Sequence, residues 1–339
     1  MTEYLEIIDQ WKDSQIPYVI ARVIKTWGSA PRQVGSVMLV NANGEMAGSV
    51  SGGCVEGAVV KKTVEIIKTK KTELVHFGVS DESAWQVGLS CGGQLDVLIQ
   101  PASDNDLFNQ LVKSIKVENP AIWISTLDEP LEETLLRMDK TDHKALGSPQ
   151  DEKVIETAIH AFKKRKHEIF HKGGKTYFAH TFPPRSKLII IGAAHITADL
   201  VYLANDHHFE TIVIDPRRAF TDKTVFKTPP DKLIDKYPSE VLLKFDLDAY
   251  TYCAILSHDP KIDDNALEVL LKSDVAYIGA LGSRKNQEKR RKRLRDNGFS
   301  EEQISRIHGP IGADIKAKTA REIALSIMAE VISVKNQYL

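Results

Sequence analysis

An apolar strand that ends in a glycine turn is the feature that most constrains the fold of this chain. Residues Lys187-Leu-Ile-Ile-Ile191 predict a strand, the turn Gly192-Ala-Ala-His195 follows it, and a helical spacing of apolar residues begins at Ile196. Strands and helices then alternate toward the C-terminus, with further strands predicted at 211–214, 254–256 and 275–278. This alternation predicts a parallel sheet with helices on both faces, which is a Rossmann-like α/β domain.

The first half of the chain has a different pattern. Consecutive prolines at Pro183-Pro184 favour a stiff, extended connector, so we place the domain boundary there, giving domains 1–183 and 184–339. The first domain combines β-branched strands, a hairpin signal at Asn41-Ala-Asn-Gly44 and single helices, which predicts a mixed α+β fold. Its core is expected at about 15–101, whereas 102–183 is less diagnostic and includes an expected loop at 139–153.

The composition narrows the class of protein. The 45 basic and 46 acidic side chains nearly cancel, so the whole-chain charge attracts neither nucleic acid nor an anionic membrane. The N-terminus lacks the pattern of a signal peptide, and no apolar run is long enough to cross a bilayer. The three cysteines Cys54, Cys91 and Cys253 form no disulfide framework, so a cytoplasmic protein is expected, and Cys253, inside an apolar strand, is expected in the core.

The glycine turn resembles a dinucleotide site only in part. In such sites, glycines let the backbone approach a pyrophosphate at a helix N-terminus, but here Ala194 stands where a second glycine is usual. Asp215 follows Gly192 at close to the spacing expected of a carboxylate that holds a ribose hydroxyl, and Arg217 could pair with a phosphate. The alternative is that Gly192 only forms a turn and Asp215 caps a loop.

Other polar residues are expected at the same edge of the sheet, because ligands of open α/β sheets bind beyond the carboxyl ends of the strands. These candidate cofactor-binding residues are His195, His258, Asp259, Gly282, Ser283 and Arg284. The basic run Lys289-Arg-Arg-Lys-Arg293 is interpreted mainly as a solvated helix face, with docking of a partner as the alternative.

In the first domain, two loops each join a cysteine to a pair of glycines. Glycines allow close approach of a ligand, and a cysteine at the start of a helix favours the thiolate that binds metals. The candidate residues in and around these loops are Ser51, Gly52, Gly53, Cys54, Glu56, Cys91, Gly92 and Gly93, together with Arg32 in the turn Gly28-Ser-Ala-Pro-Arg32. The alternative is that both cysteines are small buried apolar residues.

These segments together resemble the XdhC/CoxI family, the accessory proteins of xanthine dehydrogenase and related molybdenum hydroxylases. The matching stretches, in family order, are GSAPRQVGSVMLV (28–40), GSVSGGCVEGAVV (48–60), CGGQLDVLIQP (91–101), IIIGAAHITADL (189–200), VIDPRRAF (213–220), LSHDPKIDDNAL (256–267), YIGALGSRKN (277–286) and GPIGADIKAKTAREIALSIMAEVI (309–332). One departure is Ala194, because the turn of the family usually reads G-A-G-H.

The resemblance implies a chaperone of purine catabolism without a catalytic set of its own. It would bind molybdenum cofactor (molybdopterin), protect it during sulfuration, which would involve a cysteine desulfurase, and deliver it to apo-xanthine dehydrogenase or a related hydroxylase. The thiolates of Cys54 and Cys91 are soft ligands that suit the molybdenum, and the rim of the C-terminal sheet suits a phosphate or nucleotide.

Two other functions stay open. One is an NAD(P)-dependent oxidoreductase that uses the Rossmann cleft, against which Ala194 disturbs the phosphate turn. The other is a hydroxylase component, for which the chain lacks the four-cysteine sets of iron–sulfur clusters. A homodimer is the expected oligomer.

Overall fold

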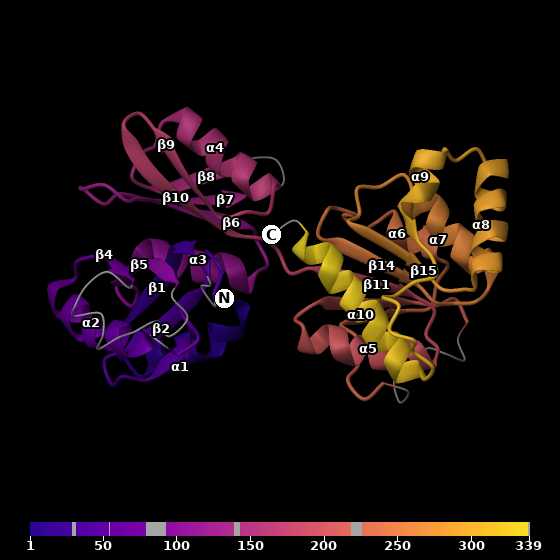
Figure 1. Ribbon diagram of the computed structural model, residues 1–339, viewed down its shortest axis with the longest axis horizontal. Coiled ribbons are helices and arrows are strands. Elements are labelled where there is room, and N and C mark those ends of the chain that lie inside the picture. The colour runs from indigo at the N-terminus through magenta and orange to yellow at the C-terminus, as the bar shows by residue number, and fades with distance from the viewer. Residues whose placement is uncertain (29–31, 54, 79–92, 139–142, 218–225, 338–339) are drawn as a thin grey trace. The chain divides into compact units, whose positions relative to one another are not determined.

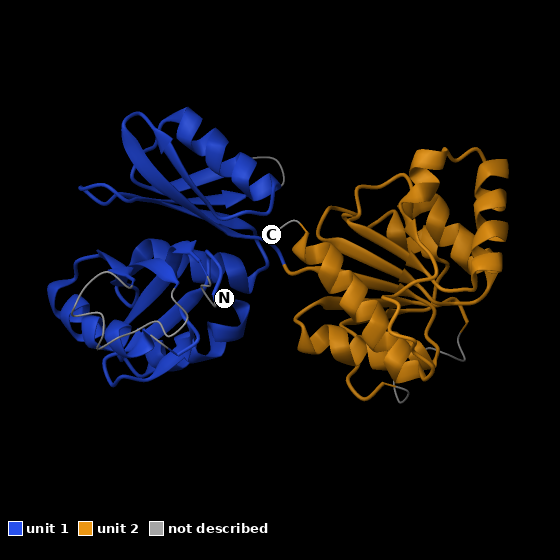
Figure 2. Ribbon diagram, viewed as in Figure 1, with its two compact units in different colours: residues 1–184 blue, residues 185–339 orange. Residues whose placement is uncertain are grey.

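The computed structural model describes residues 1–28, 32–53, 55–78, 93–138, 143–217 and 226–337. The chain divides into two compact units, Met1–Pro184 and Arg185–Leu339 (Figure 2). Within the described residues, the first unit contains two antiparallel sheets and the second contains one parallel sheet. This arrangement confirms the predicted fold class, a mixed first half and a Rossmann-like second half.

The first sheet of the first unit has the strand order β3-β2-β1-β5-β4 (Figure 1). Its strands are β1 (Tyr18–Trp27), β2 (Val37–Asn41), β3 (Met46–Gly48), β4 (Glu73–Phe77) and β5 (Gln94–Pro101). The central strand β1 is rich in β-branched residues, as a strand with buried side chains requires. Helix α2 (Glu56–Thr69) covers one face, where Val59 and Ile66 pack on residues such as Val19 and Val97.

The second sheet has the order β8-β7-β6-β10-β9. Its strands are β6 (Ala121–Thr126), β7 (Glu133–Met138), β8 (His143–Gly147), β9 (Glu168–Lys172) and β10 (Lys175–Phe182). Helix α4 (Glu152–Lys163) covers one face. The expected loop at 139–153 is wrong here, because residues 143–147 form an edge strand beside β7 and α4 begins at Glu152. That edge strand is mostly exposed, so it lacks the apolar alternation that predicts strands.

The two sheets face each other across an apolar layer that contains one buried charge. Helices α1 (Leu5–Asp13), which follows the short 3-10 turn η1 (Thr2–Tyr4), and α3 (Asp106–Lys116) contribute to this layer. The Arg22 guanidinium is fully buried and stacks on Trp123 at 3.9 Å. It donates to Gln100 at 2.6 Å and Ser125 at 2.7 Å, and lies 3.6 Å from Glu133. Burial lowers the pKa of Arg22 to about 10, so it stays charged near pH 7.

The second unit has the strand order β13-β12-β11-β14-β15-β16, all parallel. The strands are β11 (Lys187–Ile191), β12 (Glu210–Ile214), β13 (Lys232–Ile234), β14 (Thr251–Ile255), β15 (Tyr277–Ala280) and β16 (Ile307–His308). Numbered within the unit, this is the order 3-2-1-4-5-6 of doubly wound dinucleotide-binding sheets, with the switch point between β11 and β14.

Helices cover both faces of this sheet. One face packs against α5 (His195–Asp206) and α10 (Ala320–Asn336). The other packs against α6 (Pro238–Leu242), α7 (Pro260–Leu270), α8 (Arg284–Asp296) and α9 (Glu301–Ser305). Cys253 is fully buried in β14, where burial raises the pKa of its thiol, so the prediction of a core cysteine is confirmed. In the part of the chain that the structure describes, no helix is long and apolar enough to cross a membrane.

Candidate functional site

The glycine turn lies at the switch point of the parallel sheet. Gly192 has φ +103°, a conformation that favours glycine, and a Cβ atom there would lie 2.6 Å from the Cα atom of Ser257. The turn therefore brings the end of β11 against the loop that follows β14. His258 in that loop also has a positive φ, +62°, although it carries a side chain.

Asp215 is fully buried at the end of β12, and its carboxylate closes this turn. It accepts a hydrogen bond from the Ala193 N–H at 2.8 Å. Arg217 donates to it from the backbone N–H at 2.9 Å, from Nε at 2.9 Å and from Nη2 at 2.7 Å. Burial raises the pKa of the Asp215 carboxyl, but the hydrogen bonds from Arg217 and Ala193 outweigh burial and hold the pKa below its usual value. These contacts agree with the alternative in which Asp215 holds a loop.

A buried network lies beneath the same rim. Ser257 Oγ donates to Asp263 at 2.5 Å, and Arg290 donates to Asp263 at 2.9 Å and to the Leu281 carbonyl at 3.2 Å. Burial raises the pKa of Asp263 despite these partners. The network joins the loop after β14 to the loop after β15, so two of the predicted rim segments are brought together.

The remaining rim candidates cap helices or are exposed. Asp259 accepts from the Lys261 N–H at 2.9 Å at the start of α7, and Ser283 accepts from the Asn286 N–H at 3.4 Å at the start of α8. Gly282 has φ +134°. The side chains of His195 and Arg284 are exposed and begin α5 and α8.

The sequence interpretation missed Asp263 and Arg290. Arg290 belongs to the basic run interpreted as a solvated face, and that interpretation is wrong for this residue, which is 5% exposed. Helical periodicity was the available signal, because Gln287, Arg290 and Leu294 recur at spacings of three and four and share one buried face of α8.

In the first unit, the Glu56 carboxylate holds the loop that precedes α2. It accepts hydrogen bonds from the N–H groups of residues 50, 51, 52 and 53 at 3.2, 2.9, 3.1 and 2.9 Å. The hydroxyls of Ser49 and Ser51 donate to it at 2.7 and 2.6 Å. Burial raises the pKa of Glu56, but the hydrogen bonds outweigh burial and lower it to about 2. These N–H groups therefore already bind an anion, which is the side chain of Glu56.

The glycines of this loop leave a bare backbone surface. Gly52 and Gly53 are exposed with φ of +80° and +120°, and no atom lies within 4 Å of a Cβ atom placed on Gly53. Arg32 is also exposed. Cys54, Cys91 and Gly92 lie outside the described residues, whereas Gly93 is buried directly before β5.

Strand pairing brings these loops to one edge of the first sheet. β1 runs antiparallel to both β2 and β5, and Trp27 at its carboxyl end pairs with Gln94 at the amino end of β5. The Ser49 N–H donates to the Val37 carbonyl at 3.2 Å, which places the loop after β3 beside the amino end of β2. The turn after β1, the loop at 49–53 and Gly93 therefore share an edge.

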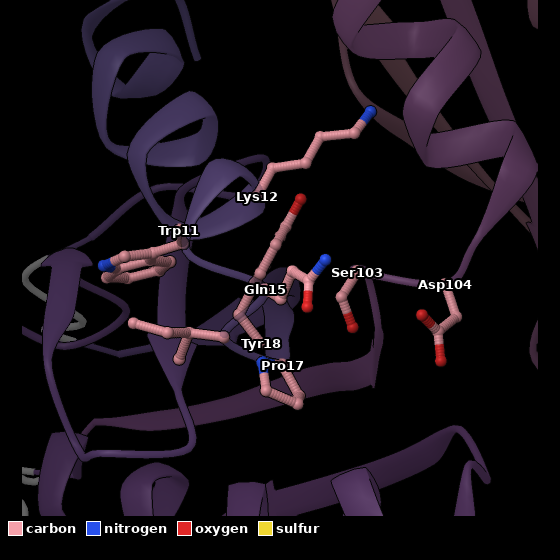
Figure 3. Close-up of a pocket in the computed structure, with 8 residues that line it drawn as sticks. Trp11, Lys12, Gln15, Pro17, Tyr18, Ser103 and Asp104 are labelled. Carbon is pink, nitrogen blue, oxygen red and sulfur yellow. The ribbon is translucent and has the colours of Figure 1, made fainter.

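A small open pocket lies elsewhere in the first unit, between the end of α1 and the start of β1 (Figure 3). Its volume of about 210 Å³ is below that of usual ligand sites. Lys12 at its wall donates to Asn109 at 3.2 Å. None of the predicted site residues lines it, so we assign it no function.

The fold and the rim geometry define the class of the second unit as a Rossmann domain attached to a separate mixed α/β unit. Residues 188–331 match the XdhC Rossmann domain, and residues 11–78 match the XdhC and CoxI family. These two matches together cover more than half of the chain. The chain belongs to the XdhC and CoxI family.

Several known proteins resemble the chain along most of its length. A Bacillus subtilis protein, named as a probable component of xanthine dehydrogenase, is 25% identical, with 99% of each chain covered. The Escherichia coli molybdenum cofactor insertion chaperone PaoD is 24% identical over 94% of this chain and 83% of its own length. The uncharacterized Escherichia coli protein YqeB is 23% identical over 96% of this chain, which spans only 45% of that protein.

A solved structure has the same fold. The crystal structure of a Bacillus halodurans protein described as a xanthine dehydrogenase matches with a TM-score of 0.76 at 26% identity, covering 98% of this chain and 96% of that one.

Proposed function

We propose that this chain is a maturation protein that binds molybdenum cofactor as cargo and delivers it to an apo-hydroxylase of the xanthine dehydrogenase type. The observation that carries the proposal is the shared edge of the first sheet, where the turn after β1, the loop at 49–53 and Gly93 meet. The kinship with an insertion chaperone supports the same role.

The described residues of this edge fit the cargo in a specific way. The bare surface over Gly53 admits the flat face of a pterin without a side chain in the way. Because Glu56 occupies the N–H groups of the loop, the phosphate would be bound by the exposed Arg32 instead. Cys54 and Cys91 would supply thiolates to the molybdenum, and a cysteine desulfurase would supply the sulfur during maturation.

The test is co-purification with the hydroxylase followed by measurement of bound pterin by fluorescence after oxidation. Cofactor retention should be lost in Cys54→Ser and kept in Cys253→Ser, because Cys253 is buried in the core of β14. Equal retention in both variants would make Cys54 a structural residue. Absence of pterin together with tight NAD(P) binding would refute the chaperone and favour the oxidoreductase.

A further inference from the structure

Helix α8 has one face that is far more basic than the rest of its unit requires. Lys285, Lys289 and Lys292 are all exposed and recur at i, i+4 and i+7, so they form a stripe about 10 Å long on one side of the helix. We call these three residues the lysine stripe. Figure 1 shows α8 on the outer side of the second unit, beside α7.

The opposite side of α8 is fixed to the domain. Leu294 is buried in the core, Arg290 pairs with Asp263, and Gln287 donates to the Ala280 carbonyl at 2.8 Å. The helix therefore presents the lysine stripe in a fixed orientation, which a docking surface needs and a flexible basic tail lacks.

The other cations of α8 have acidic neighbours within the chain. Arg293 pairs with Asp264, Arg295 pairs with Glu301, and Arg284 lies near Asp314. Across the part of the chain that the structure describes, no acidic side chain forms an ion pair with any member of the lysine stripe. Like charges four residues apart destabilise a helix, so the stripe is electrostatically unfavourable while it lacks a counter-charge.

We propose that the lysine stripe docks an acidic protein surface, and that this surface belongs to the apo-hydroxylase; the identity of the partner rests on the proposed function. The stripe carries no aromatic side chain to stack on bases and no apolar side chain to enter a membrane, so carboxylates of a protein fit it better than nucleic acid or lipid. Such a contact would speed association and depend on salt.

The test compares two triple variants that remove the same charge. Lys285→Gln/Lys289→Gln/Lys292→Gln removes the stripe, and Lys61→Gln/Lys68→Gln/Lys164→Gln removes three exposed lysines of the first unit as the control. Affinity is measured by calorimetry against the apo-hydroxylase, poly-L-glutamate and duplex DNA, at low and high salt. We expect the stripe variant to bind the hydroxylase and poly-L-glutamate about tenfold more weakly at low salt, with a flatter salt dependence, while the control changes less than about twofold.

The outcomes separate the two proposals. If poly-L-glutamate binding depends on the stripe but the hydroxylase does not bind the wild type, the acidic docking surface stands and the proposed function fails. If the hydroxylase binds the wild type and the stripe variant equally, the docking surface is refuted while the proposed function stands. Stripe-dependent binding of DNA alone, or binding of no probe at all, also refutes it.

Discussion

Replacement of Glu56 by Gln tests whether this carboxylate holds the loop before α2. Four backbone N–H groups and two hydroxyls donate to it, and its pKa falls from 4.5 to about 2. At about 1.36 kcal/mol per pKa unit, a shift of about 2.5 units corresponds to about 3 kcal/mol of stabilisation of the folded state. Gln keeps one acceptor oxygen but turns an NH₂ group toward donors, so we expect the variant to lose most of this amount.

The pH dependence gives the sign an independent check. A carboxyl with a lowered pKa contributes its full stability above its unfolded value of 4.5, and that contribution is lost as the pH falls toward about 2. The wild type should therefore lose stability over this window. Glu56→Gln should lose less there, because it lacks the titrating group.

The matched control is Glu65→Gln on the same helix, where the exposed side chain pairs with Lys62 at 3.1 Å. Such an exposed pair contributes less than about 1 kcal/mol. The measurements are urea denaturation of the full chain at neutral pH and hydrogen exchange at residues 50–53, which should accelerate only in Glu56→Gln. Equal stability loss in both variants, or unchanged exchange in this loop, would refute the reasoning.

Three further substitutions test other parts of the fold. Arg22→Met should cost about 3–5 kcal/mol, because it leaves buried polar partners unpaired, and should alter the fluorescence of Trp123, on which Arg22 stacks; unchanged thermal unfolding would contradict this. Burial lowers the pKa of His167 to about 4, so stability should be full above its unfolded value of 6.5 and fall by up to about 3 kcal/mol as the pH drops toward 4, a loss that His167→Gln should reduce in acid unfolding curves. Gly192→Ala should destabilise the second unit more than Gly298→Ala, because both have positive φ but only Gly192 faces a backbone clash; equal melting temperatures would argue against that clash.

The elements that the sequence predicted well are those with strong local periodicity. The strand at 187–191, the helix after it and the hairpin around residues 172–175 all occur, because their apolar spacing and turn glycines act over a few residues. The strands β13 and β16 have only three and two residues, too short for a pattern. They form because neighbouring parallel strands pair with them, which is information from distant parts of the chain.

The candidate site shows the same division. The sequence indicated which loops carry chemistry, but not how their polar groups are shared. The spacing of Glu56 from the glycines suggested a ligand, whereas the structure shows its carboxylate bound by the loop itself. Arg22 gave no signal in sequence, since its partners Gln100 and Ser125 lie 78 and 103 residues away.

Arg217 separates the two functions still open for the Rossmann crevice. The strand order is that of dinucleotide-binding sheets, but a ribose could bind Asp215 only by displacing Arg217, which donates three hydrogen bonds to that carboxylate. Hydrogen bonds to charged groups contribute about 1.5–3 kcal/mol each, so this displacement opposes nucleotide binding. If Arg217 blocks the carboxylate, Arg217→Ala should strengthen NAD(P) binding measured by calorimetry, and Asp215→Ala should abolish that gain. If Arg217 instead binds a phosphate, as the sequence first indicated, Arg217→Ala should weaken binding, and the crevice would then be a nucleotide site in which Asp215 orients the arginine.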